Sequence, residues 1–191
     1  MKIGTHTGRN GSNMLTVDDI VAGQTPNIVP LFEEEIPKFD NIIEIGTSLG
    51  ALTLLLNYLK KEDASLISYD ISERGVQIFG RGIDVRIGDC FKLEDEIAEE
   101  IQKEGRTILL CDGGKKNQEV NTFAQYLKSD DVIACHDYEG GRFGAIGREI
   151  IWKFGSESKL KHIESTLKKY SLEGYRYEEF ENVLWGSWRT K

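Results

Sequence analysis

Cysteine is scarce in this sequence of 191 residues, and its placement excludes a disulfide framework. The three cysteines are an odd number and lie far apart, at Cys90, Cys111 and Cys135. Domains that depend on disulfides carry an even number of cysteines at close spacing. We therefore expect free thiols in a reducing compartment. A chain of this length can bury a sufficient core without disulfides or metals.

Long apolar runs are also missing. No stretch approaches the roughly 20 apolar residues that a helix needs to cross a bilayer. Residues 1–13 are polar and glycine-rich, which is not the pattern of a secretory signal. We predict a cytoplasmic protein without a membrane partner. Its single domain is expected to cover residues 1–191, with residues 1–23 as a mobile arm in which no regular element is predicted.

Positive charge is in deficit. The chain has 24 Lys and Arg against 32 Asp and Glu, which gives a formal net charge of -8. Nucleic-acid-binding proteins need a basic surface that displaces counterions from phosphates. This balance argues against a nucleic-acid partner and favours a small-molecule substrate. The sequence does not fix an oligomeric state, and a homo-oligomer stays open.

Residues 41–56, NIIEIGTSLGALTLLL, contain the most informative pattern. An apolar run enters a loop with Gly46 and Gly50 and leaves as a second apolar run, which predicts a strand, a tight turn and a helix. Gly46 can adopt backbone angles that a side chain forbids, and Gly50 allows the helix start to lie close to a ligand. Burial of Glu44 at the strand end is costly without hydrogen-bond donors from the loop or a ligand. The alternative interpretation is that the glycines serve only the tight turn that any strand-to-helix connection in a parallel sheet needs.

The dinucleotide fingerprint GxGxxG is absent, because three residues separate Gly46 from Gly50. This spacing counts against a nicotinamide-dependent oxidoreductase.

Acidic residues end the strands predicted further along the chain. SLISYD ends in Asp70, IDVRIGD in Asp89 and TILLCD in Asp112, and DVIACHDY contains Asp137. Carboxyl ends of parallel strands meet at one edge of a sheet, so these carboxylates should share one rim, and Asp70 has the spacing from the glycine loop of a ribose-binding carboxylate. Capping of the following helix is the alternative role for Asp70 and Asp89.

The remaining pattern predicts a parallel α/β sheet that is completed by an antiparallel hairpin. Five strands alternate with apolar residues at helical spacing. Two aromatic-rich runs around Glu181 and Asn182 predict a C-terminal antiparallel hairpin. The glycine-rich loop 139–147 is expected to act as a lid. Helices are predicted over residues 25–37, after Gly50, and over residues 93–103, 113–127, 146–154 and 158–170, and a weak helix and turn over residues 75–82.

From Gln24 to the C-terminus, the order of these motifs resembles that of class I S-adenosylmethionine-dependent methyltransferases. The pattern ExGxxxG, starting at Glu44, is similar to their first motif. DGGKKNQEV and the later HDY resemble small-molecule O-methyltransferases of the catechol-type, caffeoyl-CoA-type, methyltransferase-24-like and macrocin-like branches. The resemblance implies a three-layer Rossmann-like α/β fold, with a mostly parallel seven-stranded sheet that ends in an antiparallel hairpin.

The resemblance also implies roles for individual residues. By this resemblance Glu44, Gly46 and Thr47 would hold the amino-acid end of the cofactor, Asp70 the ribose hydroxyls, and Asp89 with Cys90 the adenine. The further cofactor-binding candidates are Gly50, Ile71 and Asp112. Asp112, His136 and Asp137 match metal-ligand positions, and Lys115, His136 and Asp112 are the catalytic candidates. Metal-dependent members usually have a carboxylate where His136 stands. Magnesium prefers oxygen ligands, so a softer divalent ion or no metal stays open.

We therefore expect a methyltransferase that acts on a hydroxyl group of a small-molecule acceptor. A base, either Lys115 or His136, or a metal would lower the pKa of that hydroxyl. The alternative is an S-adenosylmethionine-binding protein without transfer activity, with a regulatory or assembly role. A zinc site built from the three cysteines is disfavoured, because the sequence has no CxxC pair and free cysteines in strands usually pack in the core.

Overall fold

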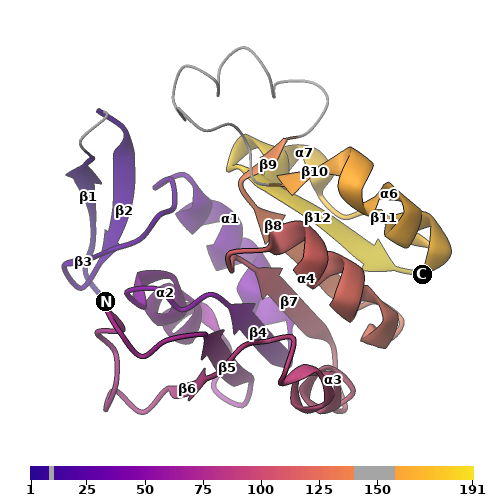
Figure 1. The fold of residues 1–191 in the computed structure, drawn as a ribbon. Coiled ribbons are helices and arrows are strands. Elements are labelled where there is room, and N and C mark those ends of the chain that lie inside the picture. The colour runs from indigo at the N-terminus through magenta and orange to yellow at the C-terminus, as the bar shows by residue number, and fades with distance from the viewer. Residues whose placement is uncertain (9–10, 140–157) are drawn as a thin grey trace.

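The computed structural model describes residues 1–8, 11–139 and 158–191. A seven-stranded sheet with helices on both faces forms its centre, and a small antiparallel sheet lies near the N-terminus (Figure 1). The strand order in the large sheet is β11-β12-β8-β7-β4-β5-β6. Within the described ranges, every helix is too short or too polar to traverse a lipid bilayer. The predicted helix 146–154 and the proposed lid from residue 140 onward lie outside these ranges.

Five parallel strands, from β8 to the edge strand β6, form most of the large sheet, as the sequence predicts. Ile43 of the middle strand pairs with Ile67 on one side and with Leu109 on the other. Three of the strands are buried at every position, because helices cover both faces of the sheet. The strands are β4 (Asn41–Ile45), β5 (Ser65–Asp70), β6 (Asp84–Ile87), β7 (Thr107–Cys111) and β8 (Val132–His136).

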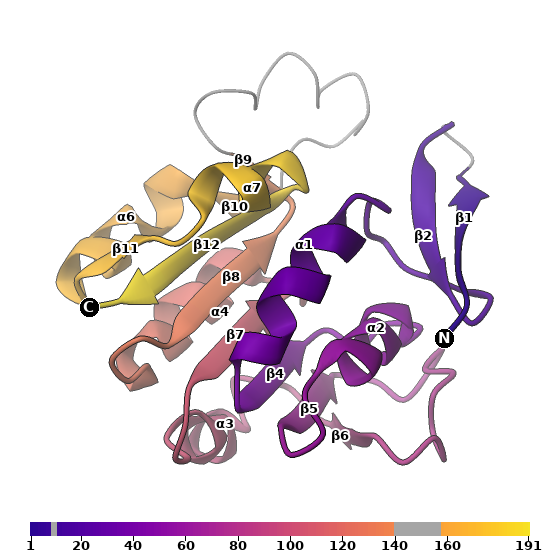
Figure 2. The same ribbon diagram turned by 180° about the vertical axis from the view of Figure 1, so that it is seen from behind.

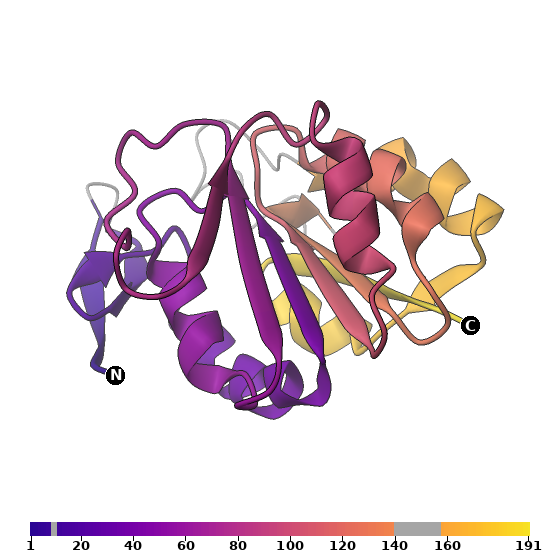
Figure 3. The same ribbon diagram turned by 90° about the horizontal axis from the view of Figure 1, so that it is seen from below.

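The helices form two layers, one on each face of the sheet (Figures 2 and 3). One core cluster joins the sheet to α1 (Ile28–Glu35) with η1 (Ile36–Lys38), α2 (Ala51–Leu59) and α7 (Tyr177–Asn182). A second cluster joins the opposite face to α3 (Glu94–Ile101), α4 (Lys116–Phe123) with η2 (Ala124–Tyr126), and α6 (Leu160–Lys169). The Rossmann-like three-layer α/β architecture implied by the sequence is confirmed.

Two helix predictions are wrong in detail. Of the weak helix and turn predicted over residues 75–82 only turns form, because Gly75, Gly80 and Gly82 all have positive φ angles that an α-helix does not accommodate. The predicted helix 158–170 begins only at Leu160. Its first two residues instead form β10 (Ser158–Lys159), which pairs with β9 (Tyr138–Glu139).

The C-terminal antiparallel hairpin is present, but its first strand was placed wrongly. That strand is β11 (Leu172–Gly174), and β12 (Trp185–Thr190) lies antiparallel between it and β8. The first aromatic-rich run forms α7 in the connection between the two strands. Phe180 of this helix is fully buried against Phe32, which explains why the run is helical and not extended.

The N-terminal residues form a sheet, so the expectation of an arm without regular structure is wrong. Its strands are β1 (Ile3–Thr7), β2 (Asn13–Val17) and β3 (Ile20–Val21). Leu15 and Val17 alternate on the face that packs into the core beside α1 and α2. Asp18 and Asp19 have positive φ angles and make the two-residue turn between β2 and β3. Two buried residues on a short strand were too weak a periodic signal to find from the sequence.

Glu44 is buried within the sheet, on the face covered by α2. Its Oε2 accepts hydrogen bonds of 2.5 Å from the hydroxyls of Thr53 and Ser68, while Oε1 has no partner among the described residues. Burial raises the pKa of the Glu44 carboxyl to about 7, although the two hydroxyls lower it. The folded protein therefore stabilises the neutral form of this side chain.

Substituting Leu15 tests the N-terminal sheet. Leu15→Ala should lower the free energy of unfolding by about 2 to 5 kcal/mol, because it opens a cavity in the core. His6→Ala, on the exposed strand β1, is the control and should change the free energy of unfolding by at most about 0.5 kcal/mol. Urea denaturation measures both. Equal, negligible effects would mean that β2 does not pack against the core.

Glu44 should make the stability of the ligand-free protein depend on pH. Its folded-state pKa of about 7 lies above the ordinary value of 4.5, so its stabilising contribution is complete below pH 4.5 and is lost as the pH rises through 7. Glu44→Gln should remove this loss, which amounts to at most about 3 kcal/mol. Thermal or urea unfolding at pH 5 and pH 8 measures the difference, with exposed Glu62→Gln as the control. A Glu44→Gln variant with the pH dependence of the unsubstituted protein would contradict the assignment.

Candidate active site

The strand order places a crevice between β4 and β7. β5 and β6 lie on one side of β4, whereas β7 and β8 lie on the other, so the chain after β4 and the chain after β7 turn away from each other. Open α/β sheets bind ligands at such a point, outside the carboxyl ends of the strands. Gly46, with φ of 104°, lies against the backbone of Asp112: a Cβ at Gly46 would be 2.4 Å from the Asp112 carbonyl oxygen. Glycine is therefore required where the two loops meet.

A cavity of about 510 Å³ occupies this crevice. Six of the nine residues predicted to bind the cofactor line it: Gly46, Asp70, Ile71, Asp89, Cys90 and Asp112. Asp70 accepts hydrogen bonds from the backbone N–H of Ser48 at 2.7 Å and from that of Ser72 at 3.0 Å. These bonds fix the carboxylate of Asp70 at the end of β5, beside the glycine loop.

The other three predicted residues lie behind the cavity wall. Glu44 faces α2, and the hydroxyl of Thr47 is 2.6 Å from that of Ser68 in the buried layer beneath the loop. Gly50 precedes α2 with φ of 94° and packs against Ile78. These residues shape the loop from below and do not line the cavity.

Glu119 lines the cavity and was not singled out from the sequence. Its carboxylate accepts the backbone N–H groups of Gly113 and Lys115, at 3.2 and 3.1 Å, and so holds the loop after β7. Burial raises the pKa of Glu119 to about 7, although these backbone donors lower it. Glu119 lies four residues after the N-cap residue Lys115, one position beyond the spacing of a capping box, and Lys115 is neither serine nor threonine, so the local sequence carries no recognised signal for this role.

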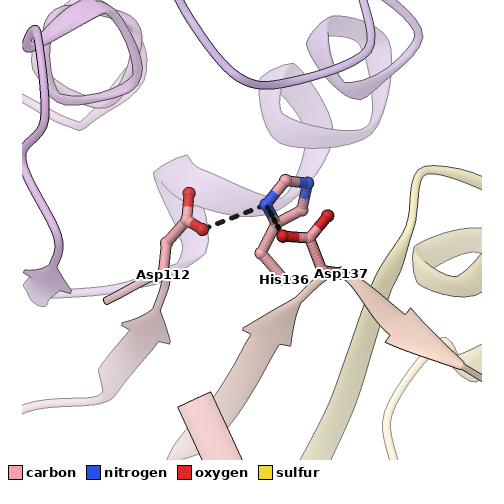
Figure 4. Close-up of side chains that lie close together, drawn as sticks. All are labelled: Asp112, His136 and Asp137. Carbon is pink, nitrogen blue, oxygen red and sulfur yellow. Dashed lines mark hydrogen bonds and ion pairs between the residues drawn. The ribbon is translucent and has the colours of Figure 1, made fainter. Parts of the chain in front are cut away.

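Asp112, His136 and Asp137 form a cluster at the ends of β7 and β8 (Figure 4). Nδ1 of His136 lies 3.0 Å from Oδ1 of Asp112 and 3.6 Å from Oδ2 of Asp137. One ligand atom from each residue lies within 4.8 Å of the others, and it is the only such group of three among the described residues. Adjacent residues of a strand normally point to opposite faces. Asp137 reaches the same side as His136 because its φ is 53°.

Gln24 completes the cluster from the N-terminal segment. Its Nε2 donates to Oδ2 of Asp112 at 2.6 Å and lies 3.4 Å from Nδ1 of His136. Its Oε1 accepts the indole N–H of Trp185 at 3.0 Å, and the ring of Trp185 packs on that of His136 with centroids 5.1 Å apart. Neither Gln24 nor Trp185 could be found from local sequence, since each is more than twenty residues from the groups it contacts.

The structure places Lys116, and not its predicted neighbour Lys115, at the cluster. Nζ of Lys116 is 3.4 Å from Oδ2 of Asp137 and 3.7 Å from Oδ1 of Asp112, and the side chain is only 6% exposed. Lys115 is exposed and lines the cavity, with its Nζ 5.8 Å from the centre of the Phe91 ring. The two lysines therefore serve different parts of the site.

Charges around His136 favour its protonated form. Burial lowers the pKa of this imidazole, but the carboxylates of Asp112 and Asp137 outweigh burial and raise the pKa above 6.5. Nε2 of His136 is buried and has no hydrogen-bond partner among the described residues.

The three cysteines do not form a site with these groups. All are buried free thiols. Burial raises the pKa of Cys90 and of Cys135 to about 12, so both are neutral thiols in this structure. Among the described residues, no group of three candidate metal ligands includes a cysteine.

Comparisons with known proteins connect this fold to methyltransferases. No protein-family model matches the chain, and no curated protein sequence matches it. An apo structure of CmcI superposes with a TM-score of 0.65 at 13% identity, covering 92% of this chain and 75% of CmcI. CmcI with Mg-SAM gives 0.61 at 13% identity, covering 92% of this chain and 76% of that one.

Two further solved structures agree. A protein from Staphylococcus aureus named as a caffeoyl-CoA O-methyltransferase has a TM-score of 0.58 at 12% identity, covering 85% of this chain and 82% of its own. Human N-acetylserotonin methyltransferase in complex with SAM has a TM-score of 0.53 at 16% identity over 86% of this chain. The chain spans about half of that enzyme, 51% of its length. The chain therefore has the fold of the class I S-adenosylmethionine-dependent O-methyltransferases.

Proposed function

We propose that this protein is an S-adenosylmethionine-dependent methyltransferase that acts on a hydroxyl group of a small molecule. The position of Asp112 carries the proposal. This residue lines the cavity at the switch point and also belongs to the cluster with His136 and Asp137. A cofactor in the cavity and an acceptor at the cluster would thus meet at one side chain, as transfer between them requires.

The cavity suits a nucleoside cofactor in size and in lining. Its volume of about 510 Å³ lies within the range of small-molecule sites. Asp70 offers carboxylate oxygens to ribose hydroxyls, and Asp89 and Cys90 line the part beyond it, where the adenine is proposed to lie. Gly46, Gly113 and Gly114 also line the cavity without side chains, so the amino-acid end of the cofactor could approach their backbone closely.

The cluster suits one divalent ion, which would be held by Asp112, His136 and Asp137. Two carboxylates and an imidazole whose ligand atoms lie within 4.8 Å of one another can bind a single ion. A metal bound there would polarise the acceptor hydroxyl and lower its pKa. The carboxamide of Gln24 holds Asp112 through Oδ2 and leaves Oδ1 directed at the cluster. This positioning is what a ligand residue needs.

Different parts of the site would then align the two substrates, stabilise charge on the acceptor and bind the cofactor. The cavity would align the sulfonium methyl group with the acceptor oxygen. The acceptor hydroxyl gives its proton to solvent, a C–O bond forms as the C–S bond breaks, and S-adenosylhomocysteine leaves. The buried ammonium of Lys116 lies beside both carboxylates, where it would stabilise the developing acceptor oxyanion. The exposed Lys115 is better placed for the cofactor side, since it lines the cavity.

The cluster and its buried lysine speak against a cofactor-binding protein without transfer activity, which needs neither. The cytoplasmic location and any homo-oligomer stay predictions from the sequence.

Asp70 provides the test of cofactor binding. Asp70→Ala should weaken binding of S-adenosylhomocysteine by about 1.5 to 3 kcal/mol, because hydrogen bonds to a charged group are lost. Isothermal titration calorimetry measures this, and Asp63→Ala, an exposed aspartate outside the cavity, is the matched control. No binding to the unsubstituted protein, or equal affinity in folded Asp70→Ala, would rule out this cofactor site.

The adjacent lysines provide a matched pair for catalysis. Lys116→Gln should lower kcat by about 100-fold or more and leave the Kd for S-adenosylhomocysteine nearly unchanged, because it removes charge stabilisation at the acceptor oxygen. Lys115→Gln should retain most of the turnover. An acceptor would first be found by screening phenols, catechols and sugars for release of S-adenosylhomocysteine. The reverse result, with activity lost only in Lys115→Gln, would restore the lysine predicted from the sequence as the catalytic residue.

A further inference from the structure

We propose that the cluster of Asp112, His136 and Asp137 selects a first-row transition ion, such as Mn²⁺, Fe²⁺ or Co²⁺, over Mg²⁺. This inference rests on the proposed function, because it concerns the ion that would assist methyl transfer. Three observations support it: the types of donor atom, the packing that fixes the position of His136, and the positive charge of Lys116.

The donor atoms are one nitrogen and two carboxylate groups. Nδ1 of His136 lies 3.0 and 3.6 Å from the nearest oxygens of Asp112 and Asp137, so an ion between these oxygens also meets the imidazole. Magnesium demands an octahedral set of oxygen ligands and binds imidazole poorly. Mn²⁺, Fe²⁺ and Co²⁺ accept imidazole and carboxylate together, with affinity rising in that order.

His136 is held in this position by its surroundings. The residue is 3% exposed, and its ring packs on the indole of Trp185. The carboxamide of Gln24, fixed by Trp185 and Asp112, lies 3.4 Å from its Nδ1. The imidazole cannot swing out to be replaced by water without disrupting this packing, so the nitrogen stays in the donor set.

The charge of the cluster also disfavours magnesium. Lys116 Nζ lies within 3.7 Å of both carboxylates, so with the imidazole neutral, as ion binding requires, two negative charges and one positive charge leave a net charge of only −1. Mg²⁺ sites depend on carboxylate charge, and a buried ammonium at this range repels any divalent ion. For a transition ion, the bond to the imidazole nitrogen can offset this repulsion. Mg²⁺ binds imidazole weakly, so the same bond offsets little of the repulsion.

The preference can be measured on the purified protein after treatment with a chelator. Calorimetric titrations with MgCl₂, MnCl₂ and CoCl₂ should give a Kd for Co²⁺ at least about tenfold below that for Mg²⁺, with Mn²⁺ between them. Pulsed electron paramagnetic resonance of the Mn²⁺-loaded protein should show coupling to a directly bound imidazole ¹⁴N. Mg²⁺ binding as tight as Co²⁺ binding, no detectable binding of any ion, or absence of the ¹⁴N coupling would overturn the proposal.

A histidine substitution isolates the donor atom. His136→Asp should shrink the ratio of the Kd values for Mg²⁺ and Co²⁺ by about tenfold or more. His6→Asp, at an exposed position of β1, is the matched control and should leave the ratio unchanged. An unchanged ratio in folded His136→Asp would contradict the proposal. If circular dichroism shows that His136→Asp does not fold, the ¹⁴N coupling of the unsubstituted protein decides the question.

Binding of S-adenosylhomocysteine separates this inference from the proposed function. Binding of this cofactor product together with no preference for Co²⁺ overturns the metal assignment and leaves the cofactor site standing. A Co²⁺ preference without any cofactor binding overturns the methyltransferase proposal and leaves the donor set of the cluster supported.

Discussion

The close approach of two loops at the centre of the sheet is the constraint on which the site depends. Gly46 after β4 touches the peptide between Asp112 and Gly113 after β7, at a separation that leaves no room for a Cβ. Asp112, at this contact, belongs both to the cavity lining and to the cluster with His136 and Asp137. A side chain at Gly46 would push β7 and its loop outward, and the two halves of the site would lose their common residue.

Buried ionisable groups surround this contact on three sides. Glu44 lies beneath the first loop and Glu119 beneath the second, and burial raises the pKa of both carboxyls. His136 lies beside Asp112, and there burial lowers the pKa of the imidazole while the carboxylates of Asp112 and Asp137 raise it. Such burial costs stability, since each of these charged groups loses hydration. The large apolar layers on both faces of the sheet can offset that cost. The fold thus maintains an arrangement that its local interactions would not stabilise on their own.

Much of the fold was predictable because its signals are local. Apolar runs that end in an acid gave the five parallel strands, and strand polarity alone placed Asp70, Asp89 and Asp112 on one cavity wall. The predictions that were wrong concern segments whose structure depends on contacts between residues distant in the sequence. The run that forms α7 is helical because Phe180 packs on Phe32, a contact between residues far apart in the sequence.

The lysine that lies beside the cluster is Lys116, whereas the sequence motif singled out Lys115. A sequence motif gives the spacing from Asp112 but not the backbone angles at the start of the helix. Lys115 has φ of -135° and ψ of 52°, outside the helical region, whereas Lys116 is the first residue of α4 and its ammonium reaches both carboxylates. A change in one residue's backbone conformation therefore decides which of two identical side chains enters the site. Gln24 was missed for a different reason, because it reaches Asp112 across 88 positions of the sequence.

The hydrogen bond between Trp185 and Gln24 joins two segments that are far apart in the chain, so the cluster can assemble only after both have been synthesised. Gln24 is made early, Asp112 and His136 in the middle of translation, and Trp185 near the end, yet all four side chains meet in one buried network. β12, which carries Trp185, also supplies the strand partner of β8, whose last residue is His136. A nascent chain that stops before residue 185 thus leaves β8 as an open edge with its imidazole uncovered. The proposed ion site is therefore assembled only when β12 has inserted beside β8.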